Sequence, residues 1–176
     1  MMMYSFLLEV LKLTVAGIGV VMVAFYLLKP FLQNKEKIQL LELKKATGAQ
    51  TLPLRLQAYE RMVLLVDRIN PSNLLLRLNT SGYTAAELHS LIVTEVRNEY
   101  QHNVTQQLYV SARAWGLVKR IKDDTLNLAA GAAKSLPEGA SGLELGRVML
   151  IHLSKMENDP YDVATNMIRA DLEELF

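Results

Sequence analysis

An uncharged stretch near the amino terminus most constrains what this chain can fold into. Residues 13–28 (LTVAGIGVVMVAFYLL) carry no charged side chain and are bracketed by Lys12 and Lys29. As a helix rising ~1.5 Å per residue, the stretch would extend roughly 24 Å, slightly less than the ~30 Å hydrocarbon core of a bilayer. The two lysines can make up the difference, because their methylene stems lie in the apolar layer while their ammonium groups reach the headgroups. We therefore predict that residues 1–29 form a transmembrane anchor.

Two other structures compete with the anchor. A cleaved signal peptide needs a basic region before the apolar stretch and a small-residue cleavage site after it. Here Glu9 offsets Lys12, and the stretch ends in Leu-Leu-Lys-Pro, so the pattern is unfavourable for cleavage. A buried core helix usually keeps a polar face, and this one would lack it for four turns. An uncleaved anchor is the preferred interpretation.

The charges on either side of the anchor predict its orientation. Residues 29–55 contain six basic and two acidic side chains, whereas Glu9 and Lys12 cancel before the anchor. The positive-inside rule then places the amino terminus outside and the carboxy-terminal domain in the cytoplasm, which corresponds to a single-pass protein of the inner (cytoplasmic) membrane. The basic residues nearest the bilayer could also attract anionic lipid. These lipid-facing candidates are Lys29, Lys35, Lys37, Lys44 and Lys45, although a role in setting topology alone is preferred.

Composition narrows the functions open to the rest of the chain. The sequence contains no cysteine, which removes disulfides, thiolate metal sites and thiol nucleophiles. Residues 56–176 carry 12 basic and 15 acidic side chains, so they lack the basic face that nucleic-acid binding requires. No phosphate-binding glycine motif occurs. We expect neither a nucleic-acid partner nor a cofactor, and no catalytic residue is assigned.

Periodicity and capping signals predict an all-α domain. Thr84 with Glu87 and Ser141 with Glu144 have capping-box spacing, so each pair should begin a helix. Gly48 should end a basic juxtamembrane helix or linker over residues 30–50. The helical cytoplasmic domain would then cover residues 51–176 as a bundle of about four to five helices, without an internal repeat. The expected helices span residues 51–69, 71–78, 84–109, 111–134, 141–157 and 159–175.

A polar stripe on the expected 84–109 helix is the strongest candidate for a site. Helical spacing places Glu95, Glu99, His102 and Gln106 on one face of that helix. Arg55 interrupts the apolar face of the preceding helix, and a buried guanidinium needs a carboxylate, so Glu95 or Glu99 is its expected partner. The predicted binding or structural polar network consists of Arg55, Tyr59, Glu95, Glu99, His102 and Gln106.

The same stripe admits a metal site. Glu99 and His102 have the spacing by which helical bundles present two metal ligands from one helix. A di-metal site needs a second such pair, and neither His89 nor His152 follows a glutamate at that spacing. A structural polar network is therefore preferred over a ligand or partner pocket and over metal binding, and no metal ligand is assigned.

Two segments of the chain resemble a known family. They are residues 52–62 (LPLRLQAYERM) and residues 99–110 (EYQHNVTQQLYV), the second followed by Trp115. They are similar to an uncharacterised bacterial family of single-pass membrane proteins with an amino-terminal anchor and a small helical cytoplasmic domain. The resemblance implies membrane attachment and a shared fold, and it carries no activity. Arg55, Glu99 and His102 lie within these segments.

These patterns favour a non-enzymatic interaction or adaptor module at the cytoplasmic membrane face. Its expected partners are the lipid bilayer and either another protein or a second copy of the chain. The alternative is a helical bundle that binds a metal or small ligand through Glu95, Glu99 and His102. A third hypothesis is a lipid-surface module acting through the basic residues that follow the anchor.

Overall fold

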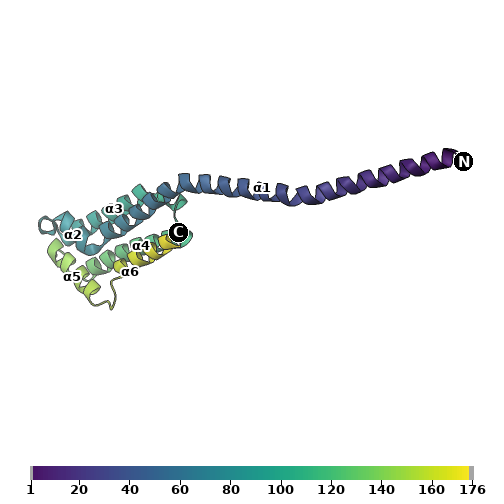
Figure 1. The fold of residues 1–176 in the computed structure, drawn as a ribbon. Helices are drawn as coiled ribbons and strands as arrows, with labels where there is room; N and C mark the ends of the chain where they lie inside the picture. The colour runs from purple at the N-terminus through teal and green to yellow at the C-terminus, as the bar shows by residue number, and fades with distance from the viewer. Residues whose placement is uncertain (1, 175–176) are drawn as a thin grey trace. The chain divides into compact units, whose positions relative to one another are not determined.

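The computed structural model describes residues 2–174, apart from the side chains of residues 31–34, 36, 40, 44, 46 and 47. All named elements in this range are helical, and the described part of the chain contains no strand (Figure 1), as the sequence predicted. The chain divides into two compact units, Met1–Thr51 and Leu52–Phe176.

The first helix, α1 (Met2–Ile69), is much longer than any element that the sequence predicted. The expectation that Gly48 ends a helix and that Thr51 begins another is wrong. Gly48 does not adopt the left-handed conformation through which a glycine ends a helix, and the Thr51 hydroxyl donates to the Gly48 carbonyl 3.3 Å away. Pro53 has no N–H to donate, so it removes one bond from the helical ladder without ending the helix.

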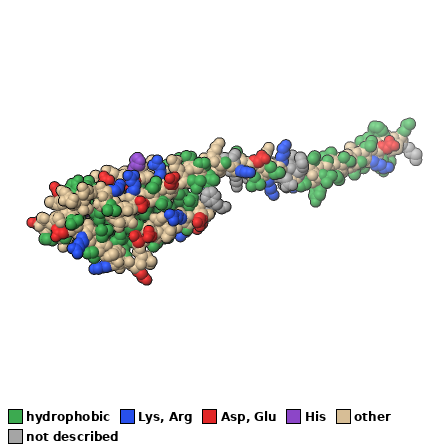
Figure 2. Space-filling view, turned by 60° about the vertical axis from the view of Figure 1, so that its left-hand side comes forward, with side chains coloured by type: hydrophobic (Ala, Val, Ile, Leu, Met, Phe, Trp, Pro, Cys, Tyr) green, Lys and Arg blue, Asp and Glu red, His purple; other side chains and the backbone are tan. Residues whose placement is uncertain are grey.

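The amino-terminal part of α1 has the properties of a membrane span. Residues Met2–Pro30 are the one stretch in the described chain that is long and apolar enough to cross a bilayer, and none of its most apolar window is buried. In Figure 2 hydrophobic side chains cover much of this stretch. The length and composition of this stretch agree with the predicted anchor.

The carboxy-terminal part of α1 packs into the second unit. The face predicted to be apolar is buried there, including Tyr59, Met62, Leu65, Val66 and Ile69. A short helix follows, α2 (Pro71–Leu78), which begins where the Asn70 side chain accepts a hydrogen bond from the Ser72 amide. Asn79, with φ of 46°, ends it in the left-handed conformation that asparagine tolerates well.

Four further α-helices complete the bundle: α3 (Ala85–Asn103), α4 (Ala112–Lys134), α5 (Gly142–Ser154) and α6 (Pro160–Glu173). Each has the predicted side chain at its N-cap, namely Thr84, Ser111, Ser141 and Asp159. The common core combines α1 with all of these helices. The capping chemistry visible in the sequence therefore locates the start of every α-helix after residue 70 correctly.

The end of α3 differs from its prediction. The helix stops at Asn103 instead of near Tyr109, and a 3₁₀ helix, η2 (Val104–Leu108), follows. The Asn103 side chain donates to the Glu99 carbonyl at 2.9 Å, and such a local bond competes with a regular helical ladder. Because a 3₁₀ helix turns further per residue than an α-helix, Gln106 no longer continues the stripe of Glu95 and Glu99.

Two capping boxes meet where the loops before α3 and α5 lie side by side. Thr84 and Ser141 form an isolated antiparallel bridge, in which Ala85 N–H donates to Ala140 O at 2.8 Å and Gly142 N–H donates to Tyr83 O at 2.7 Å. Residues 82–88 and 139–145 share the pattern Gly-x-Thr/Ser-x-x-Glu-Leu. The expectation of no internal repeat is therefore corrected: the loop of the α2–α3 pair has the same short pattern as the loop of the α4–α5 pair and contacts it.

This loop contact requires glycine at position 142. A Cβ atom there would lie 2.8 Å from the Thr80 carbonyl oxygen and 2.9 Å from that of Tyr83, and backbone cannot easily move away. At Gly146, one turn later in α5, the nearest atoms to an added Cβ belong to Leu75 at 3.6 Å, an ordinary contact. The two glycines therefore form a matched pair for substitution.

We predict that Gly142→Ala destabilises the protein and that Gly146→Ala does not. Overpacking against backbone at residue 142 should lower the free energy of unfolding by about 1–3 kcal/mol. Alanine at residue 146 should raise it by roughly 0.5–1 kcal/mol through the lower entropy of the unfolded chain. Urea unfolding of both variants in the same detergent measures the difference, and equal stabilities would contradict the role of Gly142.

The capping boxes also predict a dependence of stability on acid. Hydrogen bonds from the Thr84 backbone and hydroxyl lower the pKa of Glu87, and the same bonds from Ser141 lower the pKa of Glu144, below the ordinary 4.5. A pKa lowered by folding contributes stability above the unfolded value, and that stability is lost as the pH falls through the folded value. The free energy of unfolding should therefore decline below about pH 4.5, and NMR titration should place both midpoints under that value.

Replacing both residues with glutamine provides the control for this acid dependence. The Glu87→Gln and Glu144→Gln double variant keeps a side chain that can accept the capping bonds but cannot titrate. Its stability should depend less on pH in this range than that of the parent, whereas Glu138→Gln, at an exposed position, should leave the dependence unchanged. Identical pH profiles for all three proteins would refute the capping explanation.

Candidate functional site

A buried polar cluster joins three helices at the beginning of α4. The Tyr59 hydroxyl donates to Asp171 Oδ2 at 2.5 Å and accepts a hydrogen bond from the Ser111 amide at 3.2 Å. The Ser111 hydroxyl donates to the same carboxylate oxygen at 2.7 Å and accepts from the Ala114 amide. Tyr59 in α1, Ser111 at the N-cap of α4 and Asp171 in α6 are thereby fixed together.

The position of this cluster explains how a carboxylate is accommodated in the core. The amino end of a helix carries a partial positive charge, so Asp171 lies beside the favourable end of the α4 dipole. Its two hydroxyl donors replace part of the hydration lost on burial. Burial raises the pKa of Tyr59, and the hydrogen bond to Asp171 raises it further, so Tyr59 stays a neutral donor at physiological pH.

Arg55 supports the same region from one turn away. Its Nε donates to the Tyr109 carbonyl at 3.3 Å, so Arg55 and Tyr59 both bind the segment that connects η2 to α4. The expected pairing of Arg55 with Glu95 or Glu99 is therefore corrected. Because α3 ends at Asn103, the chain turns and presents a backbone carbonyl to Arg55 in place of a side-chain carboxylate.

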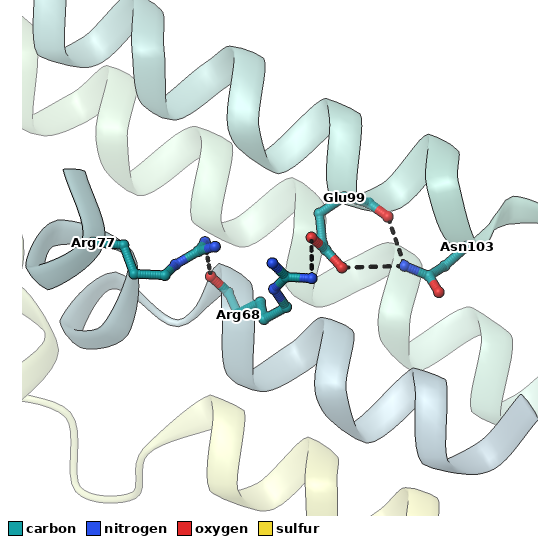
Figure 3. A network of polar contacts seen from close by, with 4 residues as sticks. All are labelled: Arg68, Arg77, Glu99 and Asn103. Carbon is teal, nitrogen blue, oxygen red and sulfur yellow. Dashed lines mark hydrogen bonds and ion pairs between the residues drawn. The ribbon is translucent and has the colours of Figure 1, made fainter. Parts of the chain in front are cut away.

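Glu99 instead belongs to a second polar network (Figure 3). Its Oε2 lies 3.3 Å from Nη1 of Arg68, and its Oε1 accepts a hydrogen bond from Asn103 at 3.2 Å. Arg77 donates to the carbonyl of Arg68 at 3.0 Å, which connects α2 to the same place. Because the Glu99 side chain is largely covered while that of Arg68 is half exposed, the network holds α1, α2 and α3 together at the surface.

The remaining stripe residues fall into different environments. His102 is exposed and, with Glu99 and Arg61, borders a polar cavity of about 600 Å³ between α1 and α3. Glu95 and Gln106 are half-buried and do not border this cavity. The structure thus brings Glu99 and His102 to one cavity and separates both from Tyr59.

The Glu99 carboxylate already pairs with the Arg68 guanidinium and accepts a hydrogen bond from the Asn103 amide. A metal ion there would have to displace Arg68 and Asn103 and recruit further ligands. In the described part of the chain, no three His, Cys, Asp or Glu side chains come close enough to share a metal. The cavity therefore offers charged groups for a polar ligand and lacks a ready set of metal ligands.

The predicted lipid-facing lysines belong to the amino-terminal unit. Lys29, Lys35, Lys37 and Lys45 are exposed on α1, and the side chain of Lys44 lies outside the described part of the structure. Nothing in that unit engages the four described ammonium groups in an ion pair. They remain available for the aqueous phase or for lipid headgroups.

Sequence reasoning missed the carboxylate at the centre of the buried cluster. Asp171 follows Ala164 and Ile168 on the buried face of α6, so its position on an apolar face was visible in the spacing. Its partners were not visible, because Tyr59 and Ser111 are 112 and 60 residues away from it in sequence.

The bundle also presents an apolar groove between α2 and α5. It encloses about 700 Å³ and is lined mainly by apolar side chains, including Leu76, Leu143, Leu150 and Ile151. Leu76 is 82% exposed and Leu143 is 64% exposed, which is unusual for large apolar residues that lie together. The groove is therefore an exposed apolar surface of this unit.

The fold and these sites define a class of protein: an all-α chain with a helical bundle and one amino-terminal helix long and apolar enough to span a membrane. Within that class, the chain belongs to the family of unknown function DUF7935, whose model matches residues 5–175. The predicted relationship to an uncharacterised family is thus confirmed. No curated protein and no solved structure matches the chain.

The buried cluster predicts strong coupling between Tyr59 and Asp171. Tyr59→Phe leaves the Asp171 carboxylate with one donor fewer and the Ser111 amide without an acceptor, so it should cost about 1.5–3 kcal/mol. Asp171→Asn should also destabilise, and the double variant should cost less than the sum of the two by about 0.5–3 kcal/mol. Urea unfolding of the parent, the two single variants and the double variant measures this coupling.

Tyr83→Phe, at an exposed tyrosine, is the control and should change stability by less than about 0.5 kcal/mol. Additive losses at residues 59 and 171 would contradict the coupling.

Proposed function

We propose that this protein is a single-pass protein of the inner membrane whose cytoplasmic helical bundle binds a protein partner. The observation that carries this proposal is the exposed apolar groove between α2 and α5, because a monomeric bundle gains nothing by leaving adjacent leucines in water. The bundle is then a tethered interaction module, and its binding surface is the groove.

The chemistry of α1 supports membrane insertion. Its amino-terminal part carries apolar side chains on all faces, and these would be costly in water but suit hydrocarbon. Thr14, a polar residue in that part, donates its hydroxyl to the carbonyls of Val10 and Leu11, so it needs no water in the bilayer. A continuous helix also satisfies its own backbone, as a lipid environment requires.

The distribution of charge supports the proposed orientation. Lysines follow the apolar stretch, while Glu9 and Lys12 balance each other before it. Because basic loops stay on the cytoplasmic side, the bundle belongs in the cytoplasm and the amino terminus outside. The same lysines would strengthen attachment to anionic lipid by ~1 kcal/mol each near the surface.

The buried polar groups favour binding over catalysis. Tyr59, Ser111 and Asp171 bond to one another inside the bundle and are fixed in place. Such a cluster stabilises a fold, whereas a general acid or base must reach a substrate. The groove is open and apolar, which suits association with another protein surface.

A cysteine-labelling experiment tests both the topology and the partner. The chain contains no cysteine, so a single cysteine introduced at Met3, Ser90 or Ser154 gives an unambiguous signal. In intact cells with a permeable outer envelope, a membrane-impermeant maleimide should label Met3→Cys and should reach Ser90→Cys and Ser154→Cys only after lysis. A membrane-permeant crosslinker that reacts with a thiol at one end and an amine at the other should join the cysteine of a bundle variant to a lysine of the partner, giving a protein adduct at near-stoichiometric yield.

Each part of this experiment has an outcome that refutes the proposal. Labelling of Ser90→Cys in intact cells would reverse the topology. Absence of an adduct at both bundle positions, with the protein expressed at its natural level, would rule out a stable protein partner. Met3→Cys, across the bilayer from the bundle, is the control for nonspecific crosslinking.

A further inference from the structure

Helix α5 is apolar on two faces, and the bundle uses only one of them. Its buried face includes Leu145, Gly146 and Met149, which pack in the core or against α2. Its other face exposes Leu143, Leu150 and Ile151, spaced at i, i+7 and i+8 along one side. The second face is therefore an unpartnered apolar stripe on an otherwise well-packed helix.

The stripe forms one wall of a groove whose other wall is α2. An added Cβ at Gly146 would lie 3.6 Å from Leu75, so α2 and α5 approach closely at the bottom of the groove. Leu76 on α2 stands 82% exposed at its edge. A concave apolar surface between two helices suits a third helix that inserts its own apolar residues at i, i+3 or i+4, and i+7.

One charge lies in the middle of this apolar surface. Arg147 is four residues after Leu143 and four before Ile151, is exposed, and forms no ion pair with any residue that the structure describes. The residues that line the groove include no acidic side chain. An apolar occupant that also carries a carboxylate would complement both properties, because a partly desolvated guanidinium binds a carboxylate bidentately.

We propose that the groove between α2 and α5 binds an amphipathic helix of another protein, with an acidic residue beside its apolar face that pairs with Arg147. This inference rests on the proposed function and specifies the chemistry of the partner. The groove supplies the apolar contact area, and Arg147 selects among apolar helices by charge and fixes their register.

The position of Arg147 also argues against a second copy of this chain. In a symmetric dimer whose two-fold axis passes through the middle of this stripe, the two α5 helices would face each other across the axis. Because Arg147 lies midway along the stripe, the axis would bring the two guanidinium groups together, and like charges at an interface disfavour association. An acidic partner helix has no such penalty.

Selection from a displayed library of short helical peptides tests the proposal. The library fixes leucines at i, i+3 and i+7 and randomises every other position, and the bait is the full-length protein in lipid nanodiscs. Enriched peptides should carry Asp or Glu at one position next to the leucines. The enriched peptides should bind the Arg147→Glu and Leu150→Lys variants at least about tenfold more weakly than the parent. When the Arg147→Glu variant is used as the bait, the selection should enrich Lys or Arg at the peptide position where the parent selects Asp or Glu.

Matched variants separate the groove from general surface effects. Arg97→Glu changes an exposed arginine on α3, and Leu108→Lys changes an exposed leucine outside the groove, so both should bind the enriched peptides as the parent does. Enrichment without an acidic preference, or equal binding to the parent and Arg147→Glu, would overturn the proposal.

Two results would assign the groove to another occupant and would equally overturn the proposal. A concentration-dependent dimer that Leu150→Lys dissociates would indicate a second copy. Protection of Ile151→Cys from a thiol reagent by nanodisc lipid alone would indicate the bilayer. A protein adduct at Ser90→Cys or Ser154→Cys combined with a failed selection would leave the proposed function intact and remove only this account of the groove.

Discussion

The second unit depends on one buried carboxylate. Asp171 would be costly in an apolar core, and it is accommodated because Tyr59 and Ser111 donate to it at the amino end of α4. These bonds connect α1, the start of α4 and α6 at a single point. Arg55 binds the same connecting segment, so the end of α3, the turn and the start of α4 have a defined geometry.

A second constraint acts at the bridge between Thr84 and Ser141. Two capping boxes with the same spacing fix the beginnings of α3 and α5 against each other, and Gly142 is small enough to allow the close approach of backbone. Because α5 is held there and packs on α2 through Gly146, its outer apolar face lies beside Leu76. The groove is therefore a consequence of how the loops pair and of how α2 packs on α5.

The two units have different surface chemistry. The amino-terminal helix has the length and composition of a membrane span, and the bundle combines a buried polar cluster with an exposed apolar groove. Holding a binding surface at a membrane raises its effective concentration toward partners in the same membrane. Under the proposed function, a modest affinity in the groove would then be enough, which fits an open surface better than an enclosed pocket.

The sequence by itself determined the helical class, the anchor-like segment, the N-cap of every α-helix that begins after residue 70 and both capping boxes, because these depend on local periodicity and on side chains within one helical turn. It misjudged Gly48 and the end of α3, since a glycine ends a helix only if it turns left-handed and Asn103 competes with its own backbone.

Only the tertiary structure decided that Arg55 binds Tyr109 and that Glu99 binds Arg68. It also decided that Asp171 joins Tyr59 and Ser111, and that α5 keeps an apolar face exposed. Those contacts connect residues far apart in the chain, and which of several compatible side chains meet is fixed by how whole helices pack.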